Sequence, residues 1–395
     1  MTFASWGKTF FPSLFFGSFF VKWRCFVTDK VFVIRGCVSL FARRQSNNNY
    51  TVSFLFQSSR KVVSFLVNRE VLACLKLLDG EHRLGDISTL RGVPPYELKW
   101  LVQRLKKEGI LEEIENVGKT VNNSVYQRQL NFFSSFEVVG AKSIDFHKRL
   151  KSAKVVILGI GGIGTWVAEL LARSGVGQLT LIDPDLVETS NLPRQALFSL
   201  NDVGRSKVWA AGKRLRALNQ ELRVKTAKKL VSSPEVLVGL VNHNHLVINC
   251  SDYPDVSVTN DIVSKACFCL GLPHILCGGY DGHLSFVGQT VIPHQTSCWN
   301  CYTSSQIYEK SLRGFKHIPI TRSSLEGGTL APVASLTASI HALEAVRIIT
   351  GYDKPVMRNR KAEIDFSSLS INFTNIPRRK DCRLCGKKRS KGVRR

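Results

Sequence analysis

The strongest constraint on the fold of this chain is a glycine-rich stretch at residues 155–166, VVILGIGGIGTW. It begins with an apolar run, which predicts a buried strand. Glycines then follow, namely Gly159, Gly161, Gly162 and Gly164. Apolar residues recur at helical spacing from Ile163 onward, so the stretch predicts a strand, a tight turn and a helix. Backbone N–H groups at such a helix N-terminus bind phosphate, which belongs either to a dinucleotide or to ATP.

Two further apolar runs predict that this strand belongs to a parallel sheet. Residues 178–185 (QLTLIDPD) and 245–252 (HLVINCSD) are almost continuously apolar and end in acids. Such runs are typical of strands that are buried on both faces in an α/β fold. Ligands bind beyond the carboxyl ends of these strands, where we expect Gly159, Asp183 and Asp252 to lie.

Residues 1–118 predict a separate unit ahead of this sheet. Residues 71–115 have the pattern of three short amphipathic helices, as in a winged-helix module, and 30–44 and 50–57 predict strands. Winged modules bind DNA, capture a peptide along a strand edge or serve only for packing, and these three options stay open. The turn signals between the helices are Asp79-Gly80 and Val93-Pro94-Pro95.

The second predicted unit spans residues 119–385 and is followed by a basic tail at 386–395. It begins with a polar linker that ends at Ser124. Residues 283–293 predict an antiparallel addition to the sheet, and residues 331–352 predict a long buried helix that ends at Gly351.

The net charge of +25 over 395 residues predicts an anionic partner, such as a nucleotide, a nucleic acid or an acidic peptide. Part of the charge lies in residues 378–395, which carry ten Lys or Arg and predict a solvated, disordered tail. The apolar stretch at 10–21, FFPSLFFGSFFV, is too short to span a bilayer, and we expect a buried hairpin there. The sequence therefore predicts a soluble, cytoplasmic protein with no membrane partner.

Residues after the second strand favour ATP over a dinucleotide. Asp183 follows Gly164 by 19 residues, where an acid binds ribose hydroxyls in either case. The segment 183–207 also offers two cations, Arg194 and Lys207, beside Ser190 and Asn191. Two cations suit a triphosphate, since negative charge builds up where phosphorus is attacked. Asp252 is a candidate ligand for the accompanying Mg²⁺.

Together these motifs resemble the ubiquitin-activating, ThiF- and MoeB-type adenylating enzymes over residues 126–385. The motifs are Tyr126-Gln127-Arg128-Gln129, the glycines from Gly159 to Gly164, Asp183 with Asp185, Ser190-Asn191-Leu192-Pro193-Arg194-Gln195, Asp202-Val203-Gly204 with Lys207, Ser251-Asp252, the pairs Cys298/Cys301 and Cys382/Cys385, and Ala331-Pro332. The resemblance implies a Rossmann-like adenylation domain that binds ATP and Mg²⁺.

The resemblance also implies a role for each residue. Asp183 would hold the ribose, Arg194 and Lys207 the phosphates, and Asp252 the Mg²⁺. Arg128 matches an arginine that reaches the γ-phosphate of the partner in a homodimer. The reaction is the attack of a carboxylate on the α-phosphorus, which gives an acyl-adenylate and pyrophosphate.

Two C-x-x-C pairs, Cys298/Cys301 and Cys382/Cys385, predict a closed tetrahedral zinc site with a structural role, with a redox disulfide as the alternative. Residues 302–381 contain no cysteine. Some members of the family use a cysteine in this region to accept the acyl group or to form a persulfide. Thioester chemistry from this segment is therefore excluded.

A winged module ahead of the adenylation domain is typical of the branch that modifies ribosomally made peptides, such as the microcin C7 and pantocin A enzymes. In that branch the module holds the precursor peptide by adding a strand to a sheet. The resemblance favours activation of Glu side chains for cyclisation with loss of water, in antibiotic biosynthesis.

Three alternatives remain. The first is adenylation at the C-terminus of a peptide, and the second is activation of a sulfur-carrier protein. The third is a DNA-tethered regulator with a degenerate nucleotide site. The intact site disfavours the regulator, and residues 96–107 lack a cluster of base-reading side chains, so a nucleic-acid partner is not expected.

Overall fold

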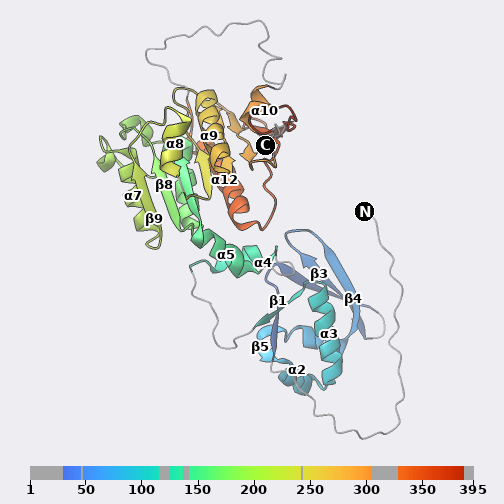
Figure 1. Cartoon of the computed structure of the whole chain (residues 1–395). Helices are drawn as coiled ribbons and strands as arrows, with labels where there is room; N and C mark the ends of the chain where they lie inside the picture. Colours follow the sequence, from blue (N-terminus) through green and yellow to red (C-terminus); the bar gives the residue numbers. More distant parts are fainter. Residues whose placement is uncertain are drawn as a thin grey trace, which may run out of the picture. The chain divides into compact units, whose positions relative to one another are not determined.

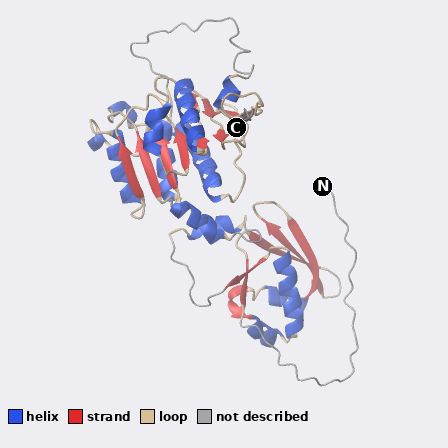
Figure 2. Cartoon of the chain, viewed as in Figure 1, coloured by secondary structure: helices blue, strands red, loops and turns tan. Residues whose placement is uncertain are grey.

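The structure is a computed structural model that describes residues 30–45, 48–114, 125–136, 142–241, 243–304 and 328–386 (Figures 1 and 2). The apolar stretch at 10–21, the linker at 116–124 and the tail after Gly386 lie outside these residues. The chain forms two compact units, residues 1–120 and 121–395.

The first unit contains two three-stranded antiparallel sheets, with orders β5-β1-β6 and β2-β3-β4. The strands are β1 (Val31–Ile34), β2 (Val38–Arg44), β3 (Asn49–Phe56), β4 (Val62–Asn68), β5 (Asp79–Arg83) and β6 (Leu111–Ile114). Residues 30–44, predicted as one strand region, form β1 and β2, with a turn between them in which the Val38 N–H donates to the Arg35 carbonyl. The alternating burial of β4 is typical of an edge strand with one face on the core.

Three helices cover the first unit, as predicted for residues 71–115: α1 (Arg69–Leu75), α2 (Leu84–Arg91) and α3 (Pro95–Lys107). The apolar stripe of α3 buries Leu98, Val102 and Leu105 in a core shared with both sheets. The segment between α1 and α2 differs from the prediction, because it forms strand β5 instead of a simple turn. The Asp79 carboxylate accepts the Glu81 and His82 N–H groups, which shapes the start of β5.

The second unit is built on a six-stranded sheet of order β14-β11-β10-β7-β8-β9, in which β14 alone is antiparallel. The strands are β7 (Lys154–Leu158), β8 (Gln178–Ile182), β9 (Arg223–Ala227), β10 (Leu246–Asn249), β11 (His274–Ile275) and β14 (Thr290–Val291). The predicted α/β fold with a buried parallel sheet is confirmed.

Helices lie on both faces of this sheet (Figures 1 and 2). One face packs against α5 (Ser143–Ser152), α6 (Gly162–Arg173), α7 (Lys207–Leu218) and α12 (Ala331–Thr350), and the other against α8 (Pro234–Val241) and α9 (Val256–Leu270). Alternate side chains of β7 serve the two layers, since Val155 and Ile157 face the first and Val156 and Leu158 the second.

A smaller antiparallel sheet, β12-β13-β15-β16, completes the second unit. Its strands are β12 (Gly279–Asp281), β13 (Leu284–Val287), β15 (Arg360–Asp365) and β16 (Ser370–Asn375). The predicted addition at 283–293 is therefore divided between β13 in this sheet and β14 in the main one.

The predicted long helix is α12, and it ends at Gly351 in the left-handed conformation, as expected. Its length and apolar composition would suffice to cross a membrane, and it is the one such helix among the described residues. Half of that apolar window is buried inside the unit, where α12 contributes Ala338, Ala342 and Ala345 to the core. We therefore interpret α12 as a core helix.

Candidate functional site

The glycine-rich turn lies at the carboxyl end of β7, and its geometry requires glycine at two positions. Gly159 has a φ of +86°, and a Cβ there would lie 2.6 Å from the Cys250 carbonyl carbon. A Cβ on Gly164 would lie 1.9 Å from the Gly159 carbonyl oxygen. Gly161 is the N-cap of α6, and a Cβ on it would meet nothing within 4 Å. Space is therefore open beside Gly161 at the N-terminus of α6, where a phosphate site would lie.

Asp183 follows β8 and joins the end of that strand to the glycine turn. Its carboxylate accepts the Ile160 N–H at 2.6 Å and the Asp185 N–H at 2.8 Å. The side chain is only 4% exposed, and burial raises the pKa of its carboxyl group above the ordinary value. A carboxylate held so firmly beside the turn suits a hydrogen bond to a sugar hydroxyl.

Two cations lie in the segment that follows Asp183. Lys207, the first residue of α7, is 8% exposed and forms an ion pair with Asp185, with Nζ 2.8 Å from Oδ2. Arg194 donates from Nη1 to the Ser190 carbonyl at 2.6 Å. Its own carbonyl accepts the Trp166 indole N–H at 3.1 Å, which anchors this segment to α6.

Two further predicted residues of this segment, Asn191 and Ser190, make hydrogen bonds within it. Asn191 is buried, and its Oδ1 accepts the Glu188 N–H at 3.0 Å in a short 3₁₀ helix, Thr189–Asn191. The Ser190 hydroxyl is exposed and donates to Glu188. Asp252 is exposed and follows β10 by three residues.

A small pocket opens at the carboxyl ends of the parallel strands. Leu158, Gly159, Ile182 and Ser251, which line it, come from the ends of β7, β8 and β10. Its wall also includes residues 229–231, which follow β9 and which the sequence analysis missed. A sequence signal for these residues would have been their position directly after a fourth strand of the sheet. Because β9 has a mixed polar sequence, the sequence does not reveal that strand.

Arg128 does not join these residues within its own chain. It is exposed on α4 (Gln127–Ser134), and the residues around it anchor that helix at the amino edge of the sheet. Gln129 donates to the Ser174 carbonyl, which precedes β8, and Asn219, which precedes β9, donates to the Tyr126 hydroxyl. The glycine turn lies at the opposite edge.

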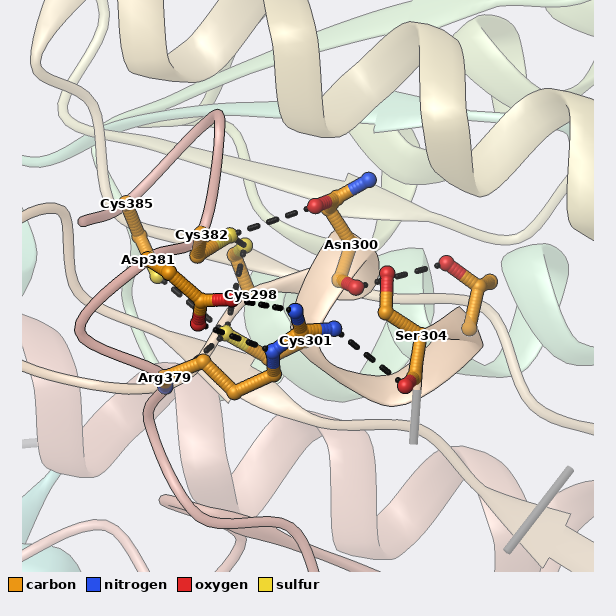
Figure 3. Close-up of polar contacts among 9 residues, drawn as sticks. Cys298, Asn300, Cys301, Ser304, Arg379, Asp381, Cys382 and Cys385 are labelled. Carbon is orange, nitrogen blue, oxygen red and sulfur yellow. Dashed lines mark hydrogen bonds and ion pairs between the residues drawn. The ribbon is translucent and has the colours of Figure 1, made fainter. Parts of the chain in front are cut away.

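The four predicted zinc ligands come together in the second unit (Figure 3). The sulfur atoms of Cys298, Cys301, Cys382 and Cys385 all lie within 4.8 Å of one another, and all four residues are buried. The Sγ–Sγ distances are 3.9 Å for Cys298–Cys301, 3.6 Å for Cys298–Cys382 and 3.3 Å for Cys301–Cys385. A disulfide needs about 2.05 Å, so the four are free thiols in this structure.

The chemistry of the cluster fits zinc. Tetrahedral Zn²⁺ with bonds of about 2.3 Å places its sulfur ligands about 3.8 Å apart, close to the distances above. The Arg379 N–H points at the Cys301 sulfur at 3.4 Å, a contact that stabilises a thiolate (Figure 3). Arg379 itself is fixed by an ion pair with Asp381 and by the Ser304 carbonyl.

Comparison with protein families assigns residues 126–384 to the ThiF family. The molybdopterin-synthase adenylyltransferase of Escherichia coli K12 is 31% identical over 245 residues, which is 61% of this chain and 90% of that enzyme. The ThiS sulfur-carrier adenylyltransferase of the same organism is 29% identical over 62% of this chain and 90% of its own length.

Solved structures resemble a larger part of the chain. E. coli MccB, crystallised with selenomethionine MccA, matches 90% of this chain and 99% of its own, with a TM-score of 0.68 and 25% identity. Selenomethionine PaaA matches 85% of this chain and 98% of its own, with a TM-score of 0.67 and 25% identity. The described fold and the matched residues show that this chain belongs to the ThiF family of ATP-dependent adenylating enzymes.

Proposed function

We propose that this enzyme modifies a ribosomally made precursor peptide by activating Glu side chains as acyl-adenylates. The observation that carries the proposal is the share of this chain that each group of similar proteins covers. The two sulfur-carrier-type relatives match 61–62% of the chain, and the family match begins at Tyr126. MccB and PaaA match 85–90%, a share that includes much of the first unit. MccB was crystallised with MccA, so we extend a peptide substrate to this chain.

The proposed reaction balances without a redox step. A carboxylate oxygen of the peptide attacks the α-phosphorus of ATP, and pyrophosphate leaves. A nitrogen of the same peptide then attacks the acyl carbon, AMP leaves with the carboxylate oxygen, and a ring forms with net loss of water. No cysteine of residues 302–381 takes part, because there is none.

The nucleotide site supplies the charges that this reaction needs. Two anions must approach each other, so positive charge near the phosphates lowers the barrier. We assign the phosphates to the N-terminus of α6, to Arg194 and to Lys207, and the ribose to Asp183. Ser190 and Asn191 shape the loop that carries Arg194. Asp252 would hold the Mg²⁺ that accompanies ATP.

Arg128 has a place in this scheme only if the enzyme is a homodimer. Its helix is anchored at the amino edge of the sheet, opposite the glycine turn of its own chain. We therefore assign Arg128 to the γ-phosphate in the site of the partner subunit.

We assign the precursor peptide to the free edge of β4 in the first unit. In the order β2-β3-β4, the second edge of β4 has no partner strand among the described residues. Arg104 of α3 lies over the Phe65 ring of β4, and Lys61, just before β4, pairs with Glu108, just after α3. An extended peptide added there would use the unpaired backbone groups of β4 and the apolar side chains nearby.

Structural zinc belongs to the same proposal. Held by the four cysteines, Zn²⁺ would join residues 298–301 to residues 382–385 across 80 intervening residues and leave no open position for catalysis. We place the enzyme in the cytoplasm, where ribosomal peptides are made and thiolates stay reduced.

A second candidate function is activation of a sulfur-carrier protein. The likeness to the ThiS adenylyltransferase favours it, because that relative is described by this activity. Adenylation at a peptide C-terminus is a variant of the main proposal and differs from it in which carboxylate reacts.

We expect pyrophosphate exchange with MgATP when a Glu-containing precursor peptide is supplied, with loss of water from the peptide. A sulfur-carrier protein with a Gly-Gly tail should support no exchange. Leu66→Glu, on exposed β4, should raise the KM for peptide about tenfold with little change in kcat. The matched control, Leu90→Glu on exposed α2, should behave like the wild type. Exchange with the carrier alone would refute the peptide proposal.

Asp183→Asn tests the ribose assignment. Asparagine has one side-chain oxygen, so one of the two backbone N–H groups at this site loses its acceptor, at a cost of about 1–3 kcal/mol in stability. We expect ATP affinity to fall at least about tenfold in calorimetric titration. Asp365→Asn is the matched control, because Asp365 also accepts a backbone N–H, from Ser367 at 2.8 Å, outside the site. Unchanged ATP affinity of Asp183→Asn would contradict the assignment.

Metal analysis of enzyme purified under reducing conditions should find about one zinc ion per chain. Cys382→Ser should lose the metal and lower the melting temperature, because the zinc bond energy contributes to folding. Cys269→Ser, at an exposed cysteine outside the cluster, is the control and should retain zinc. A zinc-free wild-type enzyme would overturn the zinc assignment.

A further inference from the structure

A buried network of polar side chains joins the end of β10 to helix α9 and to the segment after β11. It contains Asn249, the last residue of β10, and Thr259 and Asn260 of α9. Asn249 and Asn260 are fully buried, and Thr259 is 3% exposed. Asn249 Nδ2 donates to Thr259 Oγ1 at 3.2 Å and to Asn260 Oδ1 at 2.9 Å. None of these three residues is among the site residues predicted from the sequence.

Asn260 fixes this network to the chain beyond β11. Its Oδ1 also accepts the Cys277 N–H at 2.7 Å, and its Nδ2 donates to the Cys277 carbonyl at 3.1 Å. The side-chain polar atoms of all three network residues have hydrogen-bond partners, which offsets the cost of burying them. A buried polar network that is fully satisfied in this way is rigid.

The network holds both sides of Ser251. Asn249 Oδ1 accepts the Ser251 N–H at 3.1 Å, and the Thr259 hydroxyl donates to the Ser251 carbonyl at 2.7 Å. Ser251 and Thr259 both line the pocket at the carboxyl ends of the strands. The same backbone lies against the glycine turn, because a Cβ on Gly159 would lie 2.6 Å from the Ser251 nitrogen. The network therefore fixes the chain after β10 at the site to which we assign ATP.

Asp252 is the next residue of this segment. Its side chain is exposed, and its carboxylate forms no ion pair with any of the described residues. Such oxygens suit Mg²⁺, which binds to proteins through one or two carboxylates and keeps several waters. Beyond Asp252 the chain is held again at Asp255, whose carboxylate caps α9 by accepting the Ser257 and Val258 N–H groups. The segment that carries Asp252 is thus bound to α9 at both ends.

We propose that Asn249, Thr259 and Asn260 are positioning residues for adenylation, which hold Ser251 so that the Asp252 carboxylate faces the Mg²⁺ of ATP. The inference rests on the proposed role of Asp252. A carboxylate binds a metal more tightly when its backbone is already held in place, because ordering that backbone on binding would cost conformational entropy. Apolar side chains at the three positions could also pack α9 on the sheet, but they would leave the Ser251 N–H and carbonyl without these partners.

Thr259→Val keeps the shape of the side chain and removes the hydroxyl. The measurement is ATP affinity in calorimetric titration over a series of Mg²⁺ concentrations. We expect the Mg²⁺ concentration that gives half of the maximal gain in ATP affinity to rise about tenfold, the usual effect of disturbing the support of a metal ligand. ATP affinity in Mg²⁺-free buffer should stay near that of the wild type, because Asp252 acts through the metal. Thr259→Ser retains the hydroxyl and should restore the wild-type Mg²⁺ dependence.

Thr350→Val is the matched control. Thr350 is also fully buried in a helix, and its hydroxyl donates to the Val346 carbonyl at 2.6 Å and accepts the Tyr352 N–H at 3.3 Å, outside the site. Both valine variants should lower the melting temperature to a similar extent, but Thr350→Val should keep the wild-type Mg²⁺ dependence. Thr259→Ala removes the same hydroxyl as Thr259→Val and gives the same readout if the valine variant does not fold. An equal shift in the control, or wild-type Mg²⁺ dependence without the Thr259 hydroxyl, would overturn the positioning role.

The combination with Asp252→Asn tests whether the network acts through Asp252. The single substitution Asp252→Asn should itself raise the Mg²⁺ concentration required, and Thr259→Val should add little to that effect. Multiplying effects of the two substitutions would overturn the inference, and so would unchanged Mg²⁺ dependence of Asp252→Asn. Failure of the proposed peptide substrate has a different signature, since the wild type would then bind MgATP but show no peptide-dependent exchange.

Discussion

The proposed nucleotide site depends on the pair of hydrogen bonds that the buried carboxylate of Asp183 accepts from the Ile160 and Asp185 N–H groups. One bond holds the glycine turn after β7 against the end of β8. The other fixes the start of the loop that leads to the two cations. These bonds therefore fix the N-terminus of α6, the acid that we assign to the ribose and the loop that carries the cations relative to one another. Burying this carboxylate costs free energy. The two hydrogen bonds that offset the cost also fix the geometry of the site.

Distant segments of the chain also come together in the second unit. The four cysteines bring residues 298–301 and 382–385 together, and Asn260 of α9 joins the end of β10 to Cys277. The second unit is that of a ThiF-family enzyme. We assign the choice of substrate to the first unit.

The sequence predicts those features that local physical rules govern. The glycine turn follows from the spacing of its glycines, and the end of α12 follows from Gly351. Features set by tertiary packing were missed. Strand β5 forms where a turn was expected because β1 supplies a pairing edge. Residues 229–231 and Thr259 join the pocket only through the course of β9 and α9, which no motif marks.

The central claim is that a peptide carboxylate attacks the α-phosphorus of ATP. The most direct measurement uses a precursor peptide whose Glu carboxylates carry ¹⁸O, followed by mass analysis of the nucleotide products. The account predicts that one ¹⁸O atom appears in AMP for each ring formed, with unlabelled pyrophosphate. Label in inorganic phosphate with release of ADP would contradict it, because the carboxylate would then have attacked the γ-phosphorus.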